Sequence, residues 1–562
     1  MNAIQTLITE HIDIWTAADT AKKSGRGRSS GNAASVYGIK KLRELILELA
    51  VRGKLVPQDE NDEPASELLK RIQAEKAKLI AEGKIKKSKS LSEINDDEKL
   101  FAIPRNWARA NFGEIYSLEY GDNLPSGKRS NSGEYPVYGS NGVVGSHHVC
   151  FVSSPCIVVG RKGSAGALNL SSSTGCCVTD VAYYCIPPKH LDLIFSFKLF
   201  HTLGLNSLGK GIKPGLNRNE AYDLPVAIPP LAEQHRIVAK VDELMALCDQ
   251  LENQHSNADV AHEKLVSYLL GTLTQSQSAE DFNTNWQRIA AHFDTLFTTE
   301  TSIDALKQTL LQLAVMGKLV PQDPNDEPAS ELLKRIQAEK AKLIAEGKIK
   351  KSKPLAAITE EEKPFDLPLG WQWAHFPELG EFGRGKSKHR PRNDPKLFNP
   401  GIYPLVQTGE VARAINVISE YHSKYSDVGL AQSKMWPVGT LCITIAANIA
   451  DSALLGFDAC FPDSVVGFVP CDPLNDTKYL LAFMKTAREN LLKFAPATAQ
   501  KNINLEILES VLIPLPPLKE ISRIVAKVDE LMAICDQLKS RLTAANQLQQ
   551  KLADVLVEQA TA

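Results

Sequence analysis

The chain has 562 residues, of which 43% are hydrophobic and 23% charged, and its formal net charge at pH 7 is −2. This length predicts three or four domains with buried cores. The near-neutral charge neither supports nor excludes a nucleic-acid partner, because charge can be concentrated locally. The sequence has no run of about 18 apolar residues and no signal pattern, so we expect a cytoplasmic protein without a membrane span. Ten cysteines without a CxxC pair are typical of free thiols in a reducing compartment.

Two stretches of the sequence occur twice. The run KLVPQDENDEPASELLKRIQAEKAKLIAEGKIKKSK extends from Lys54 to Lys89 and returns with one change, 264 positions later, from Lys318 to Lys353. IVAKVDELMALCDQL, which begins at Ile237, returns with one change 287 positions later. A period this long indicates duplication of a domain-sized unit rather than a stack of small repeats. The segments between the repeats share little sequence, so we interpret the chain as two copies of one frame that hold different inserts.

In chain order, residues 4–16 predict a short amphipathic helix, and a stretch rich in Lys, Gly and Ser behind it predicts a flexible linker. Each copy then begins with two helices that we expect to form a hairpin. The first helix ends at Gly53 or Gly317, and the second ends at Gly83 in the first copy. The basic tail that follows from Lys84 is either a solvated linker or a phosphate contact.

The inserts contain short strand-like runs separated by Gly, Pro, Ser and Asn, such as CIVVG at Cys156 and SVVGFVP at Ser464. After each insert comes a long helix whose apolar positions alternate four and three apart, which predicts a coiled coil. An antiparallel pair of about 35 residues would hold the inserts roughly 50 Å apart, at about 1.5 Å per residue. The apolar positions are Ile237, Val241, Leu244, Cys248, Leu251, Ala258, Leu265 and Leu269 in the first helix, and Ile524, Val528, Leu531, Cys535, Leu538, Leu542, Ala545, Leu552 and Leu556 in the second.

The predicted architecture is a multidomain α+β protein with an internal pseudo-two-fold duplication. Two mixed α/β insert domains are separated by a helical frame with a long antiparallel coiled coil. The expected segments are an N-terminal helix and linker (1–38), a first helical region (39–99), the first insert domain (100–230), a central helical region (231–363), the second insert domain (364–517) and a C-terminal coiled-coil helix (518–562).

Several stretches resemble catalytic motifs, but their sequence context does not fit catalysis. GEFGRGKS at Gly380 matches the phosphate-loop pattern, but Pro391 follows where that loop requires a helix. Asp59 and Glu82 together with Lys84 resemble the residue set of a metal nuclease, yet their position favours a solvated helix end. The histidines form no zinc-ligand spacing, and the Asn/Asp-Pro-Pro-aromatic motif of an amino-methyltransferase is absent from the sequence. We therefore expect no catalytic residue, metal or cofactor in this chain.

Polar, glycine-flanked stretches in both inserts favour DNA recognition. Arg, Lys, Asn and Gln are the side chains that read base edges in the major groove, and glycine permits close backbone approach. For each single residue an ordinary turn is the alternative, but the grouping in both inserts favours DNA. The candidates are Lys128, Arg129, Tyr138, Ser140, Asn141, Arg161, Lys162, Ser164, Lys210, Lys213, Asn217 and Arg218 in the first insert, and Arg384, Lys386, Lys388, Arg390, Gln407, Thr408, Arg413, Asn448, Gln500, Lys501, Asn502 and Asn504 in the second.

The sequence resembles the specificity subunit of type I restriction-modification enzymes over nearly its whole length. The resemblance rests on the repeated frame, on Pro104 and Trp107 at the start of an insert, on YGSNG at Tyr138 and RKGS at Arg161, and on GLNR at Gly215 before a long helix. It implies a non-catalytic subunit in which each insert is a target recognition domain that reads one half of a split site in double-stranded DNA. It also implies two modification subunits, which use S-adenosylmethionine to methylate adenine, and two restriction subunits, which use ATP and Mg.

Two alternatives stay open on the sequence alone. One is a self-contained methyltransferase or NTPase, which methyl transfer or ATP hydrolysis by the purified chain would reveal. The other is a recognition adaptor of a different DNA-defence system, which would not co-purify with subunits that carry the methylation motif.

Overall fold

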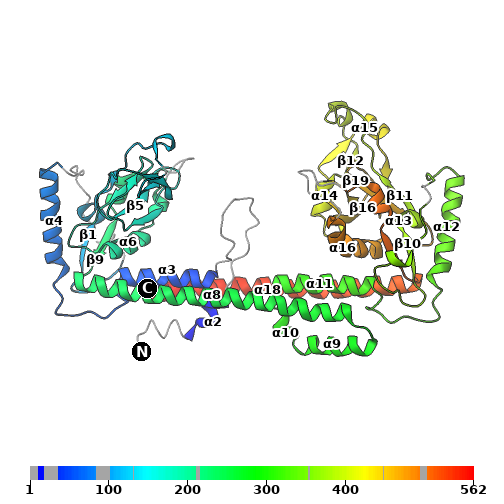
Figure 1. The fold of residues 1–562 in the computed structure, drawn as a ribbon, viewed down its shortest axis with the longest axis horizontal. Helices are drawn as coiled ribbons and strands as arrows, with labels where there is room; N and C mark the ends of the chain where they lie inside the picture. Colours follow the sequence, from blue (N-terminus) through cyan, green and yellow to red (C-terminus); the bar gives the residue numbers. More distant parts are fainter. Residues whose placement is uncertain are drawn as a thin grey trace. The chain divides into compact units, whose positions relative to one another are not determined.

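The computed structural model describes residues 10–17, 36–83, 101–130, 132–209, 215–351, 355–446, 448–493 and 503–561 (Figure 1). The chain divides into two compact units, residues 1–259 with 544–562 and residues 260–543. Two long helices, α8 (Leu231–Gln275) and α18 (Leu518–Thr561), contribute residues to both units. Residues 4–9 of the predicted N-terminal helix, the linker behind it and the basic tail 84–89 lie outside the described residues.

The first unit contains the first insert domain. Its helices are α2 (Ile12–Ala17), α3 (Tyr37–Val51), α4 (Ala65–Ala81), α5 (Phe112–Ile115), η2 (Ser126–Lys128), α6 (Leu193–Thr202), η3 (Leu205–Leu208) and α7 (Arg218–Tyr222). Its strands are β1 (Ala108–Asn111), β2 (Glu119–Tyr120), β3 (Tyr135–Gly139), β4 (Gly142–His147), β5 (Cys156–Gly160), β6 (Leu168–Ser171), β7 (Cys177–Val178), β8 (Ala182–Cys185) and β9 (Pro225–Ile228).

The second unit contains the second insert domain. Its helices are α9 (Ala279–Ala291), α10 (Phe293–Leu296), α11 (Glu300–Val315), α12 (Ala329–Ala345), η4 (Glu360–Glu362), α13 (Phe376–Leu379), η5 (Pro395–Leu397), α14 (Thr408–Arg413), α15 (Asp427–Ala431), α16 (Lys478–Lys493) and α17 (Leu505–Glu509). Its strands are β10 (Gln372–His375), β11 (Gly380–Arg384), β12 (Tyr403–Leu405), β13 (Val417–Ile418), β14 (Ser423–Tyr425), β15 (Met435–Trp436), β16 (Leu441–Thr444), β17 (Ser452–Leu455), β18 (Ala459–Cys460), β19 (Val465–Pro470) and β20 (Leu512–Leu515).

The two insert domains share a common set of strand pairings although they share little sequence, and the second domain adds one strand to each sheet, β13 and β15. Each begins and ends in an antiparallel ribbon, β1 with β9 and β10 with β20. The larger sheet runs β2-β8-β5-β6 in the first domain and β11-β19-β16-β17-β13 in the second. The smaller sheet runs β4-β3-β7 and β14-β12-β18-β15, and a parallel pair joins β3 to β7 and β12 to β18. These mixed, strand-rich domains confirm the predicted fold class.

The frame makes the same polar contacts in both units. Trp107 Nε1 donates to Glu233 at 3.0 Å, and Trp371 Nε1 donates to Glu520 at 3.1 Å. Burial raises the pKa of both glutamate carboxyls. Three more pairs of bonds match: Arg236 to Asp62 and Arg523 to Asp326 (2.6 and 2.7 Å), Arg43 to Asp249 and Lys307 to Asp536 (both 2.6 Å), and Lys198 to Asp242 and Lys478 to Asp529 (2.6 and 2.8 Å).

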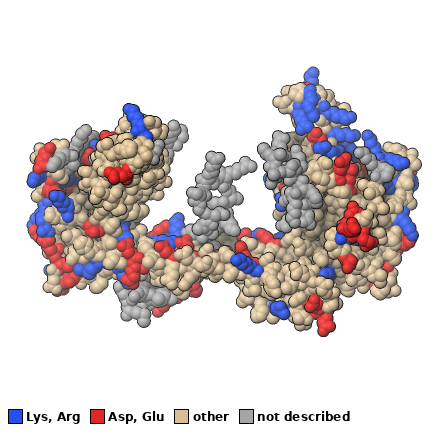
Figure 2. Space-filling view, in the orientation of Figure 1, with Lys and Arg blue, Asp and Glu red and all other residues tan. Residues whose placement is uncertain are grey.

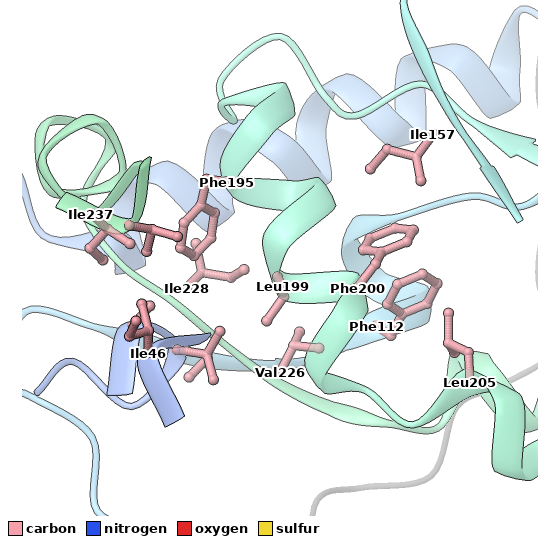
Figure 3. Close-up of a cluster of buried hydrophobic side chains, with 14 of the residues drawn as sticks. Ile46, Phe112, Ile157, Phe195, Leu199, Phe200, Leu205, Val226, Ile228 and Ile237 are labelled. Carbon is pink, nitrogen blue, oxygen red and sulfur yellow. The ribbon is translucent and has the colours of Figure 1, made fainter. Parts of the chain in front are cut away.

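One apolar core joins the first insert domain to its part of the frame. Figure 3 shows Phe195, Leu199 and Phe200 of α6 next to Val226 and Ile228 of β9, with Ile46 of α3 and Ile237 of α8 in the same cluster. Aliphatic and aromatic side chains buried together remove apolar surface from water, at roughly 25 cal/mol per Å². The core therefore fixes the domain on the helices beneath it.

The predicted hairpin of the first two frame helices is wrong. Both helices exist, and Gly53 and Gly317 end the first of them with φ of +69° and +70°. However, α4 contacts α5 and β1 of the insert domain, and α12 likewise contacts α13. The apolar side of α4, with Leu68 and Ile72, belongs to the core that includes Phe112. Helical periodicity predicts an apolar face but does not say which element covers it.

The predicted seam of the long helices is correct only in its first half. Ile237, Val241, Leu244 and Cys248 are buried, but Leu265 is 49% exposed. The buried residues of that half of α8 are instead Val266, Leu270 and Leu273, and in α18 the buried residue is Ala553 while Leu552 is 44% exposed. Both buried stripes thus shift by one residue. The predicted separation of roughly 50 Å remains a prediction, obtained from about 1.5 Å per residue.

Replacing Gly53 or Gly317 by alanine should destabilise the corresponding unit by about 2–4 kcal/mol, because left-handed backbone strain adds to a clash. A Cβ there would lie 2.4 Å from Pro104 Cγ or 2.5 Å from Pro368 Cγ. Gly83 is a matched control with φ of +72° and nothing within 4 Å, so Gly83→Ala should cost only the backbone strain, about 1–2 kcal/mol. Urea unfolding measures all three variants, and equal losses would contradict the clash.

None of the helices in the described part of the chain has the length and apolar character needed to cross a membrane. All ten cysteines are free thiols.

Candidate nucleic-acid interface

The loop between β5 and β6 gathers several predicted residues of the first domain. The N–H of Gly160 donates to Ala167 O at 2.7 Å, which closes the loop on itself. A Cβ at residue 160 would lie 2.0 Å from Ser164 O and 2.4 Å from Ser140 O, so only glycine fits there. This close approach places Ser164 beside Ser140, at the turn between β3 and β4. Asn141 is exposed at that turn.

The start of α7 joins the same place. The N–H of Leu216 donates to Arg161 O at 2.9 Å, and Lys162 pairs with Gly215 in an isolated antiparallel bridge. These bonds bring Arg218, the first residue of α7, next to the β5–β6 loop. Residues 140, 161–164 and 218, which are far apart in the sequence, therefore lie together on one local surface.

At this surface Arg161 and Arg218 both stack on Tyr120, which the sequence analysis missed. The Tyr120 ring centroid lies 4.7 Å from Arg161 Cζ and 4.8 Å from Arg218 Cζ. The Tyr183 ring lies 5.0 Å from that of Tyr120, and its hydroxyl donates to Leu216 O at 3.1 Å. Burial raises the pKa of Tyr183. A single tyrosine at the end of a two-residue strand gives no pattern from which its role could be predicted.

Lys128 and Arg129 lie on a separate segment that contacts β4. Arg129 donates from Nη1 to Val144 O at 3.1 Å and from Nε to Leu124 O at 3.3 Å. Lys128 is exposed. Arg129 thus holds the segment in place, and Lys128 is the side chain available for a phosphate.

Three predicted residues have structural roles. Tyr138 is only 9% exposed, so it cannot reach a base edge. Asn217 is the N-cap of α7 and accepts the N–H of Asn219, and Asn504 is the N-cap of α17 and accepts the N–H of Ile507. Capping accounts for both asparagines, since their oxygens satisfy helix N–H groups. The two N-cap asparagines belong to the scaffold that both domains share.

In the second domain the basic residues are concentrated in the loop after β11. Arg384 Nε donates to Asp463 O at 2.8 Å, and Arg392 forms an ion pair with the Asp463 carboxylate at 2.9 Å. The loop continues into η5, which packs against α15, and Figure 2 shows Lys and Arg side chains gathered over the end of the domain that carries α15. Lys388 and Arg390 are exposed in this loop, and Lys386 is partly buried.

No helix begins between residues 385 and 394, all of which the structure describes, and β11 covers the first five residues of the phosphate-loop match. The interpretation of that match as a basic loop is thus supported. Within the described residues, no group of three or more His, Cys, Asp or Glu is placed to hold a metal ion.

The remaining candidates of the second domain lie on two other segments. Gln407 precedes α14, which begins at Thr408, and Arg413 at its end forms an ion pair with Glu410 at 3.2 Å. Asn448 is exposed on the β16–β17 loop, which corresponds to the β5–β6 loop of the first domain. The candidates Lys210, Lys213, Gln500, Lys501 and Asn502 lie outside the described residues.

The two domains present different side chains at this corresponding loop. The N–H of Ile503 donates to Ile445 O at 3.0 Å, as the N–H of Leu216 donates to Arg161 O. The first residues of α7 and α17 are Arg218 and Leu505. Where the first domain has two arginines, the second therefore has Ile445 and Leu505.

Two domains of one topology, each with basic side chains at its surface and both built on a duplicated frame, define a two-domain DNA-recognition protein. The model of the family "Type I restriction modification DNA specificity domain" matches residues 104–260 and 368–547. The specificity subunit of the type I restriction enzyme EcoAI from Escherichia coli is 38% identical over 99% of this chain and 100% of its own length, and that of EcoEI is 39% identical over the same shares.

The chain belongs to the family of type I restriction-modification specificity subunits, and it is a non-catalytic DNA-recognition subunit of an enzyme complex. This membership overturns the alternative of a self-contained methyltransferase or NTPase. Among solved structures, one that describes complex assembly and conformational transition of the type I R-M system has a chain with 18% identity and a TM-score of 0.47, covering 82% of this chain and 99% of that chain.

Proposed function

We propose that each recognition domain reads one half of a split, asymmetric DNA site. The observation that supports this proposal is that the two domains share one scaffold but differ in the side chains that the scaffold carries. The anchors Trp107–Glu233 and Trp371–Glu520 match closely, yet the partly exposed Arg161 of the first domain corresponds to the buried Ile445 of the second, so the surfaces at this loop differ. Base edges are read by the side chains that reach the groove. Two different surfaces on equivalent scaffolds therefore favour two different half-sites, with an unread gap between them.

The frame docks the partner subunits. Membership of the family implies modification and restriction subunits as partners. Equivalent ion pairs on α8 and α18, such as Arg43–Asp249 and Lys307–Asp536, support two equivalent docking faces and hence two modification subunits, with two restriction subunits added for cleavage. The partners supply S-adenosylmethionine, ATP and Mg, and this chain directs adenine methylation or DNA cleavage to the recognised site. Ten free thiols support a reducing compartment, the cytoplasm.

Exchange of one insert tests the half-site assignment. Residues 105–220 are replaced by the corresponding insert of a relative, and the modified adenines of a host that carries the complex are mapped by single-molecule sequencing. One half of the motif should change while the other half and the gap stay fixed. The reciprocal exchange in the second domain is the control and should change the other half. A change in both halves after one exchange would refute the assignment.

A further inference from the structure

In the first domain, two arginines are held in position by contacts with uncharged groups, so neither arginine is part of an ion pair with these groups. Arg161 and Arg218 stack on Tyr120, a residue that is itself 47% exposed. Arg161 Nη1 donates to Asp180 O at 2.8 Å, and Arg218 Nη1 donates to Leu118 O at 3.0 Å. A ring and a carbonyl oxygen carry no formal negative charge, so these contacts orient each guanidinium without neutralising it.

Such an arrangement suits bidentate hydrogen bonding by a pre-oriented donor fork. An arginine has five N–H donors in a planar fork, and each of these two spends one donor on a carbonyl oxygen. Because ring and carbonyl already restrict the side chain, less conformational entropy is lost when the remaining donors bind. The acceptor pair that matches the fork in the major groove is O6 and N7 of guanine.

The fold itself does not require the arginines. The second domain builds the same loop and the same short helix with Ile445 and Leu505 at the corresponding places. A role limited to stabilising the scaffold would therefore not explain why two partly exposed cations are stacked here.

We propose that Arg161 and Arg218, positioned by Tyr120, read guanine in the half-site of the first domain. This inference rests on the proposed half-site reading and adds the base class to it. It predicts at least one fixed G·C pair in the half of the motif that exchange of residues 105–220 alters. Tyr120 is a positioning residue, because it acts through the two guanidiniums.

The test uses this chain in complex with its modification subunits. In Arg161→Gln and Arg218→Gln, methylation of sites that lack the G·C pair should rise about tenfold or more relative to the natural motif, as expected for loss of a bidentate contact. The second half-site should not change. Arg161→Lys retains the charge but loses the fork, so it should relax the same position. Tyr120→Leu should relax it partly, because both arginines lose their support.

Arg109→Gln is the matched control. Arg109 lies in the entry ribbon of the same domain and stacks on Phe101 at 5.6 Å, so its loss should leave the motif unchanged. If a variant complex does not methylate, competition binding with duplexes altered at single base pairs of the half-site gives the same readout. A natural half-site without any G·C pair, or full preference for that pair in both Gln variants, would overturn the inference. Neither result would affect the half-site assignment, which insert exchange tests separately.

Discussion

Glu233→Ala should destabilise the first unit by about 1–3 kcal/mol, because it leaves the buried indole N–H of Trp107 without its acceptor. The Glu233 carboxylate is 1% exposed and accepts bonds from Trp107 Nε1 at 3.0 Å and Gln58 Nε2 at 2.7 Å. Trp107 stands where the chain enters the insert domain, so loss of the bond should loosen the ribbon of β1 and β9. Hydrogen exchange should show faster opening around β1, with β10 of the other unit unaffected.

The second copy provides a matched variant. Glu520 accepts bonds from Trp371 and Gln322, both at 3.1 Å, so Glu520→Ala should produce the same loss around β10. Glu243 on α8 is the control, because its side chain is 64% exposed and pairs with Lys240. Exposed ion pairs contribute about 0–1 kcal/mol, so Glu243→Ala should be nearly neutral. If Glu233→Ala were as mild as Glu243→Ala, the buried bond would not anchor the domain.

If the two domains read two half-sites as proposed, removing two heptads from both long helices should shorten the gap between the halves. The chain passes between the two units only within α8 and α18, at 259/260 and 543/544. Fourteen residues span about 21 Å of helix, which corresponds to about six base pairs at 3.4 Å each. Deletion of whole heptads keeps the apolar stripe in phase. The original motif should no longer be modified, and a motif with the same halves and a shorter gap should replace it.

A length-preserving control separates distance from composition. The same fourteen positions in each helix are refilled with two unrelated heptads of equal apolar pattern, and the gap should then stay at its natural length. Methylome sequencing compares both proteins. An unchanged gap in the shortened protein would show that the long helices do not set the distance between half-sites.

The frame could be predicted from the sequence because its repeats are nearly identical. Gly53 and Gly317 were expected to end helices, and both adopt positive φ. The partner of α4 could not be predicted, because Leu68 and Ile72 specify an apolar face and nothing about what covers it. The shift to Val266 in α8 was missed because Leu265 also fits a coiled-coil spacing.

The candidate surfaces were predicted less completely. Arg161 and Arg218 are 57 positions apart in the sequence, and they meet only in the fold, through the bond from Leu216 N–H to Arg161 O and their shared stacking on Tyr120. Tyr120 is not part of any sequence motif from which its role could be predicted. Tyr138 was misassigned because the flanking Gly, Ser and Asn look like an exposed turn, whereas the tyrosine itself points into the core. The common topology of the inserts was invisible because strand pairing is set by alternating burial, which many different sequences satisfy.

The two insert domains join the frame through matching contacts, and this match has an evolutionary consequence. Each domain is held by a tryptophan, a buried glutamate and a two-stranded ribbon at the place where its chain enters and leaves. Homologous recombination within the duplicated stretches would replace an insert by a foreign domain and keep these contacts to the frame intact. One crossover would thus give a bacterial lineage a subunit with a new DNA specificity, while the frame that holds the recognition domains stays unchanged.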